Sequence, residues 1–188
     1  TRGVLTPWSY IALAAAGGNL AGTSVEKACQ ALFNELKNGA TTSYATLILT
    51  ILSAGGDPFN YQGQNLVQKL QEAQLPSGKF ADNVINGGEE LVNAHIWAML
   101  ALQAAGASIP DKEKALAWLA ARQHADGGFH WYAGEKTTAD VDSTGMALMA
   151  LGALGEKEDS PSVSKALAYL QAVQNDNGGF SSWGVANP

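Results

Sequence analysis

The side chains best suited to hold a ligand are aromatic residues that follow two successive copies of a sequence repeat. Trp131 and Tyr132 come shortly after one copy, and Trp183 follows the next. Aromatic rings beside carboxylates suit sugars and flat organic molecules. We expect these rings to line the rim of a pocket for a small molecule or glycan. The alternative is that they pack over the next helix of the core.

A second set of candidate binding residues occupies one position near the start of three predicted helices. Tyr44 and His95 are 51 residues apart, and His95 and Thr144 are 49 apart. Equivalent positions of repeated helices face the same side, so the three side chains can point into one pocket. A single histidine on an apolar helix is more often a hydrogen-bonded core residue, and that alternative stays open for His95.

Two carboxylates, Asp140 and Asp142, stand just before the predicted helix 143–154. A carboxylate in this place can accept a backbone hydrogen bond as an N-cap and favours the positive end of the helix dipole. The sequence predicts that Asp142 is the cap, with its side chain on the amide of Gly145. Asn93 occupies the same position of an earlier helix and is also a good cap residue.

The sequence gives little support for a metal site, a disulfide or a cofactor. His124 and His130 flank Asp126, but a glycine turn separates the two histidines, so we expect no metal site. Cys29 is the single cysteine, which excludes an internal disulfide and a cysteine-cluster metal site. It lies on an apolar helical stripe and is interpreted as a core residue. No cofactor is expected.

An internal repeat positions these residues. The segment 114–123 returns as 165–174, a shift of 51 positions, and Gly-Gly-Phe follows each copy after three residues. A fainter copy lies 49 residues upstream, where Lys79 stands in place of the second glycine. Repeats of about fifty residues indicate stacked supersecondary units.

Apolar periodicity predicts a chain of helices without strands. The segments fall at about 7–16, 24–37, 43–54, 63–74, 91–105, 111–123, 143–154 and 161–174. Two types alternate along the chain. One type, such as 91–105, is apolar on nearly every side and is predicted to be an inner helix, whereas 111–123 keeps a charged side and is predicted to be an outer helix.

The string Lys-Ala-x-x-(Trp/Tyr)-Leu-x-x-x-Gln-x-x-x-Gly-Gly-Phe resembles the Gln-Trp repeat of squalene and oxidosqualene cyclases. Phe129 and Phe180 stand where that repeat usually has Trp. The resemblance is to the terpenoid cyclase and protein prenyltransferase superfamily, and it implies an all-α fold, the α/α toroid. A complete toroid has six helix pairs, but this sequence supplies about four inner and outer pairs, so we expect an incomplete barrel.

The glutamines of the repeat are predicted to be structural. Gln123 and Gln174 lie near the ends of outer helices, where they can bond backbone groups of neighbouring helix ends. Phe129 and Phe180 are expected to pack over the turn. Direct contact of these side chains with a ligand is the alternative.

Residues 140–144, Asp-Val-Asp-Ser-Thr, also look like the Asp-x-Asp-Asp acid motif of class II terpene cyclases. In that family the middle carboxylic acid, here Asp142, protonates an alkene or epoxide, which requires a dry, aromatic-lined cavity. Ser143 replaces the last Asp, and this difference favours capping over catalysis. Two other activities of the superfamily do not fit. Protein prenyltransferases need a zinc-binding cysteine at the position of Asp142. Thioester domains need a reactive cysteine, and residues 87–90 contain none.

Composition limits the remaining function classes. Hydrophobic residues make up 46% of the chain, and residues 1–188 are predicted to form a single domain. Because the chain starts without Met and the next inner helix would begin beyond residue 188, we expect a fragment of a longer protein. A net charge of −6 without a basic stripe argues against nucleic acid as a partner. The apolar stretches are too short for membrane insertion.

Gly-Gly-Phe toroid repeats are also similar to those of bacterial secreted and surface proteins. That resemblance implies a non-catalytic recognition module outside the cell or on its surface, which binds a small molecule or glycan. The alternatives are a class II terpene-cyclase-like enzyme with Asp142 as the acid, and a purely structural spacer. An unfinished ring exposes apolar inner-helix faces, so we expect self-association or contact with other domains of the same chain.

Overall fold

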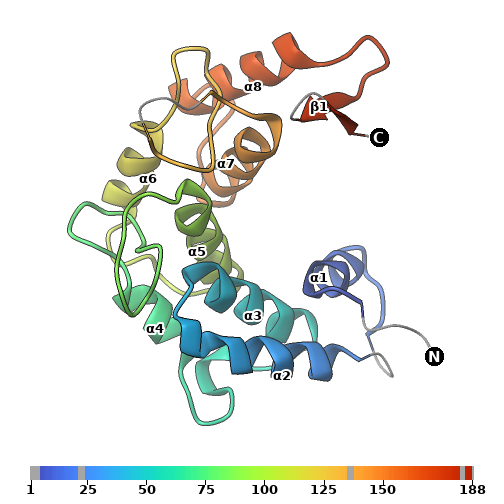
Figure 1. Cartoon of the computed structure of the whole chain (residues 1–188), viewed down its shortest axis with the longest axis vertical. Coiled ribbons are helices and arrows are strands. Elements are labelled where there is room, and N and C mark those ends of the chain that lie inside the picture. Colours follow the sequence, from blue (N-terminus) through green and yellow to red (C-terminus); the bar gives the residue numbers. More distant parts are fainter. Residues whose placement is uncertain (1–4, 21–23, 135–137, 183–184, 188) are drawn as a thin grey trace.

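The computed structural model describes residues 5–20, 24–134, 138–182 and 185–187, and these form two curved rows of helices (Figure 1). The inner row consists of α1 (Pro7–Ala15), α3 (Thr41–Ser53), α5 (Val92–Ala104) and α7 (Val141–Ala153). The outer row consists of α2 (Val25–Glu35), α4 (Leu66–Glu72), α6 (Lys112–Ala120) and α8 (Pro161–Val173). The rows bend into an open arc with α1 near one tip and α8 near the other. The predicted fold, an incomplete α/α toroid, is confirmed.

Small apolar residues allow the inner helices to pack side by side. Helix α5 lies between α3 and α7 and contacts both. Its Ala94, Ala98 and Ala101 are completely buried, and alanine lets two helix axes approach closely without leaving a void. The core therefore runs as a continuous band between the two rows.

Two inner helices begin two residues earlier than the sequence predicts, α3 at Thr41 and α7 at Val141, whereas α5 begins at Val92, one residue after its predicted start. The N-cap residues are Ala40, Leu91 and Asp140. Asn93 and Asp142, which were predicted as caps, are instead the second residues of α5 and α7. The prediction was wrong because it placed the cap at the most polar residue. The observed cap residues are instead those that pair with a loop: Ala40 with Asn83, Leu91 with Tyr132 and Asp140 with Phe129.

Glutamine side chains join consecutive repeats, as predicted. Nε2 of Gln123 donates to the carbonyl oxygens of Gly127 and Ser162, both at 2.8 Å. Gln74 makes the corresponding bonds to Gly78 and Asp111, at 2.8 and 2.9 Å. Each glutamine thus closes its own turn and holds the start of the next outer helix.

A glycine lets each turn approach the next outer helix. Gly127 has a φ of 95°, and a Cβ built on it would lie 2.4 Å from the carbonyl oxygen of Lys165. No side chain fits in that space. Gly78 stands in the same relation to the backbone of Lys114.

Lys79, which replaces the second glycine of the motif, is completely buried. Its Nζ donates to the carbonyl oxygen of Phe80 at 2.7 Å and pairs with the carboxylate of Asp82. The same carboxylate accepts hydrogen bonds from the backbone N–H groups of Glu90 and Leu91, at 2.8 and 2.9 Å. The ion pair therefore fixes the loop that leads into α5.

Short elements complete the described chain. Two 3₁₀ turns, η1 (Leu36–Asn38) and η2 (Pro58–Asn60), connect helices, and β1 (Phe180–Ser182) pairs antiparallel with β2 (Val185–Asn187). The prediction of no strand was wrong, because three-residue strands are too short to show an alternating pattern. Within the described ranges, no helix has the length and apolar character needed to cross a bilayer.

Candidate active site

The Asp-Val-Asp-Ser-Thr segment forms the start of the inner helix α7. Asp140 is its N-cap: Oδ1 accepts a hydrogen bond from the backbone N–H of Ser143 at 2.7 Å, and Oδ2 accepts one from the Ser143 hydroxyl at 2.8 Å. The predicted capping of Gly145 by Asp142 is therefore wrong. Asp142 lies in the first turn with its side chain exposed, at the positive end of the helix dipole.

Backbone contacts fix this helix start against the preceding loop. The hydroxyl of Thr144 donates to the carbonyl oxygen of Asp140 at 2.6 Å and accepts from the N–H of Phe129 at 2.9 Å. The N–H of Asp140 donates to the carbonyl oxygen of Phe129 at 2.8 Å. The chain on both sides of Asp142 is thus held in place, which is what a positioned acid requires.

An apolar hollow of about 390 Å³ lies on the concave face of the arc. All four inner helices line it, through Trp8, Ile11, Ala12, Leu49, Trp97, Leu100, Gln103, Ala104, Met149 and Ala153. The rings of Trp8 and Trp97 lie 4.5 Å apart between centroids at an interplanar angle of 43°. Among the described lining residues only Gln103 carries an amide or charged group, so the hollow suits a hydrocarbon.

Asp142 and the hollow share one face of α7. Met149 and Ala153 follow Asp142 by seven and eleven residues, which places all three on one helical stripe. From the rise per residue, Met149 lies about 10 Å and Ala153 about 16 Å along the axis from Asp142. A ligand lying along this face therefore meets a carboxyl group at one end and an apolar wall at the other.

Helix α5 repeats this layout beside α7. Asn93 stands where Asp142 stands in α7, and Trp97 and Leu100 follow it by four and seven residues on the way into the hollow. Oδ1 of Asn93 is buried and has no hydrogen-bond partner in the described part of the chain. A buried acceptor without a donor is uncommon in folded proteins. The concave face thus has a polar end, formed by Asn93 and Asp142.

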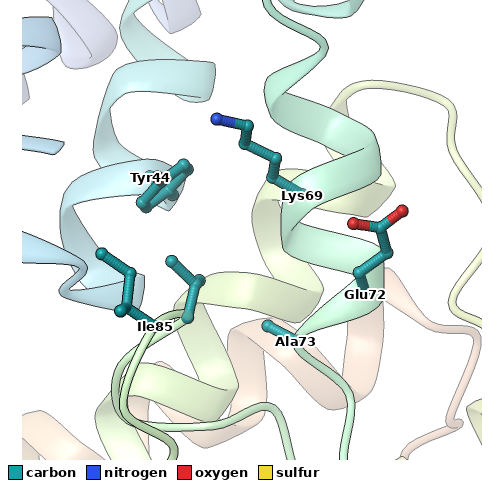
Figure 2. Close-up of a pocket in the computed structure, with 6 residues that line it drawn as sticks. Tyr44, Lys69, Glu72, Ala73 and Ile85 are labelled. Atoms are coloured by element: carbon teal, nitrogen blue, oxygen red, sulfur yellow. The ribbon is translucent and has the colours of Figure 1, made fainter. Parts of the chain in front are cut away.

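The structure does not bring His95, Tyr44 and Thr144 into one pocket. His95 is completely buried: Nδ1 accepts from the N–H of Phe80 at 3.0 Å, and Nε2 lies 3.0 Å from the carbonyl oxygen of Ala115. Burial lowers the pKa of His95 to about 4, so the ring is neutral at pH 7. It has the structural role that the sequence left as the alternative. Tyr44 lines a separate hollow between α3 and α4 (Figure 2).

The predicted aromatic rim is described only in part. The rings of His130, Trp131 and Tyr132 lie in sequence, with neighbouring centroids 5.5 and 5.6 Å apart. The carbonyl oxygen of Trp131 accepts from the N–H of Val92 at 2.8 Å, which places this loop at the start of α5. Trp183 lies outside the described residues. Ligand binding by these aromatics stays a prediction.

Sequence reasoning missed most of the residues that line the hollow. Trp97 and Met149 were interpreted as general core, because α5 and α7 are apolar on nearly every side. The concave face could have been recognised only from the polar residue at the start of each inner helix, Asn93 or Asp142, and from the residues that follow it at helical spacing. In the described ranges, no group of three or more His, Cys, Asp or Glu side chains could hold a metal ion. That the protein binds no metal stays a prediction.

The fold and the repeated helix joints define a member of the terpenoid cyclase superfamily. The family model of the squalene-hopene cyclase C-terminal domain matches residues 40–187, and the chain belongs to this family. Drimenyl diphosphate synthase of Streptomyces showdoensis is 34% identical over 123 residues, which make up 62% of this chain and 22% of the synthase. The chain thus spans about a fifth of the length of this relative.

These comparisons correct the expected function. The sequence was interpreted as a non-catalytic recognition module, with a cyclase-like enzyme as the alternative. The matched family is a cyclase domain, and the curated relative is a synthase. Both favour the enzyme over the recognition module. The loss of the last Asp of the acid motif was given too much weight, because Ser143 still supports the start of α7 through its bonds to Asp140. The expected location outside the cell stays a prediction.

Proposed function

We propose that this chain supplies the acid-bearing wall of a class II terpene-cyclase active site, with Asp142 as the general acid. The observation that carries the proposal is that Asp142 and the apolar hollow lie on one face of α7. The substrate class is an isoprenoid chain with a terminal alkene or epoxide. The similarity to drimenyl diphosphate synthase supports a substrate that also carries a diphosphate.

In the proposed reaction, the carboxylic acid of Asp142 transfers its proton to a carbon of the terminal alkene. The electron pair of the next alkene along the chain then forms a carbon–carbon bond to the resulting cation. The last cation loses a proton to water, and Asp142 regains one, so the net reaction is an isomerisation. Trp8 and Trp97 line the hollow beside the hydrocarbon, where aromatic quadrupoles can stabilise positive charge.

The test uses the full-length protein that carries this chain, incubated with farnesyl diphosphate, geranylgeranyl diphosphate and squalene. Gas chromatography with mass spectrometry, after phosphatase treatment, detects cyclic products. Asp142→Asn removes the proton donor and should lower the rate at least about 100-fold. Asp159→Asn, at an exposed site beyond α7, is the matched control and should leave the rate unchanged.

Two outcomes count against this function. One is that no cyclic product forms from any of the three substrates. The other is that Asp142→Asn retains the rate of the unmodified protein, which would show that the acid lies elsewhere.

A further inference from the structure

A hollow near the start of α3, between the inner and outer rows, has the chemistry of an anion site and shares no lining residue with the concave hollow. It lies between α2, α3, α4 and the loop 83–87, and Tyr44, Lys69 and Ile85 line both of its parts. One part has a volume of about 240 Å³ and the adjoining part about 400 Å³. We call it the Tyr44 hollow; Figure 2 shows the first part.

Two lysines bring positive charge to the larger part of the Tyr44 hollow. Lys37 and Lys69 both line the larger part. In the described ranges, ion pairs to carboxylates form at Lys79 and Lys114 but at neither of these two lysines. Lys69 donates to the side-chain oxygen of Gln64 at 2.6 Å, which uses one of its three N–H groups.

Glu72 is the carboxylate among the described residues that line the Tyr44 hollow, and it lines the smaller part only. Oε1 of Glu72 accepts a hydrogen bond from Nε2 of Gln68 at 2.8 Å, on the surface of α4. Figure 2 shows the Glu72 carboxylate turned away from Tyr44, whereas the Lys69 side chain extends toward Tyr44. An anion in the larger part would therefore meet the ammonium groups of Lys37 and Lys69, and none of the described residues that line this part carries a carboxylate.

Tyr44 adds a hydroxyl donor to the same space. Its side chain is only 5% exposed, and burial raises the pKa of its phenol, so the hydroxyl keeps its proton at pH 7. In the described ranges this hydroxyl makes no hydrogen bond to protein, and its oxygen is not fully buried, so it can donate to a group in the hollow. A ligand oxygen in the hollow would satisfy it.

Apolar side chains form the rest of the wall. Phe33 and Leu36 line the larger part, and Ile85 stands at the edge of both with 63% of its surface exposed. Oδ1 of Asn83 accepts from the N–H of Ile85 at 2.9 Å, and its Nδ2 donates to the carbonyl oxygen of Asn38 at 2.8 Å. Ile85 is thus held in position by its loop, and a hydrocarbon group of a ligand would cover it.

We propose that the Tyr44 hollow binds a small amphiphilic anion, namely a phosphate or carboxylate group attached to a short branched hydrocarbon. Lys69, Lys37 and Tyr44 hold the anionic group, and Ile85 and Phe33 cover the hydrocarbon. The site does not depend on the cyclase reaction, because it uses none of the residues of the concave face.

Titration calorimetry on the full-length protein tests this site. The probes are dimethylallyl diphosphate, 4-methylpentanoate, inorganic pyrophosphate and the uncharged alcohol 4-methylpentan-1-ol. We expect one of the two amphiphilic anions to bind more tightly than pyrophosphate and the alcohol, and the stronger of the two identifies the anionic group. Affinity should fall as salt is raised, because both lysines are exposed.

Variants locate the binding. Lys69→Gln should weaken it about tenfold and Tyr44→Phe about threefold, as expected for losing a charged and a neutral donor. Lys157→Gln, which removes an exposed lysine elsewhere, and Asp142→Asn should bind as the unmodified protein does. Asp142→Asn also separates this site from the active site, because it should stop cyclisation and leave this binding intact.

The proposal is overturned if neither amphiphilic anion binds at millimolar concentration. It is equally overturned if Lys69→Gln binds with unchanged affinity, or if the alcohol binds as tightly as the anions.

Discussion

At the scale of single residues, different side chains make the same bond in successive repeats. His95 and Thr144 both accept the N–H of the phenylalanine in the preceding loop, Phe80 and Phe129 respectively, at 3.0 and 2.9 Å. Threonine does so without titrating, but histidine brings a buried ring that must stay neutral. This hydrogen bond is therefore sensitive to acid where His95 makes it and insensitive where Thr144 makes it.

The first prediction concerns this histidine. Burial lowers the pKa of His95 to about 4 from an unfolded value near 6.5, so the unfolded chain binds more protons between these values. The stabilisation is fully present above pH 6.5 and is lost as the pH falls toward 4, by up to about 3 kcal/mol. Urea unfolding of the chain and of His95→Gln between pH 7 and 4 measures it.

His95→Gln should show a shallower fall in the free energy of unfolding over that range, whatever its stability at pH 7. Equal slopes for the two proteins would show that His95 does not titrate on unfolding. Histidine resonances followed by NMR give an independent value of the pKa.

The N-cap of α7 was predicted wrongly because two nearby aspartates could each have capped the helix. Asp140 and Asp142 are equally good caps by residue type. The choice is made by the loop, because pairing between Phe129 and Asp140 holds Asp140 in an extended conformation just before α7. This pairing joins residues eleven apart, and no local pattern in the sequence shows it. Periodicity located the helix well but not its first residue.

At the scale of elements, the outer helices α4 and α6 are each attached to the next repeat by a glutamine that follows the helix. Gln123 bonds both its own turn, at Gly127, and the start of α8, at Ser162. Gln174 bonds only its own turn, at Gly178, within the described chain, and it is exposed. The sequence could predict this role because the glutamine recurs at a fixed distance from the glycines.

The second prediction compares these two glutamines. Gln123→Ala removes two partly buried hydrogen bonds and should lower the free energy of unfolding by about 2 kcal/mol. Gln174→Ala is the matched control and should cost less than about 1 kcal/mol, since one exposed bond is lost. Thermal and urea unfolding of both variants measure the difference. Equal losses would mean that the bond to Ser162 contributes nothing.

At the scale of the whole molecule, the arc presents its inner face as a surface. Met149 is 57% exposed and Trp8 is 42% exposed, and both line the concave hollow. The sequence predicted that an unfinished ring would expose apolar inner-helix faces. The position of the hollow could not be predicted, because it depends on how far four helices curve, and curvature is a property of packing between repeats.

The third prediction is that the 188-residue chain self-associates through this face. Met149→Glu places a charge on the face and should weaken association at least about tenfold, because a buried unpaired carboxylate is costly. Phe59→Glu, at a 45% exposed residue of η2 away from the concave face, is the control. Sedimentation velocity over a range of concentrations measures it. A chain that stays monomeric throughout, or equal association by both variants, would rule out the concave face as the contact.

The joints between repeats have a consequence for protein engineering. Gln74 and Gln123 reach carbonyl groups, Thr144 and His95 receive amide groups, and Gly127 leaves room for the backbone of Lys165. Because every chain has these partner groups regardless of its side chains, the joints themselves do not restrict which unit of about fifty residues follows, and only the apolar packing between inner helices must be matched. Chimaeras that exchange one such unit would change the residues that one inner helix contributes to the cavity wall.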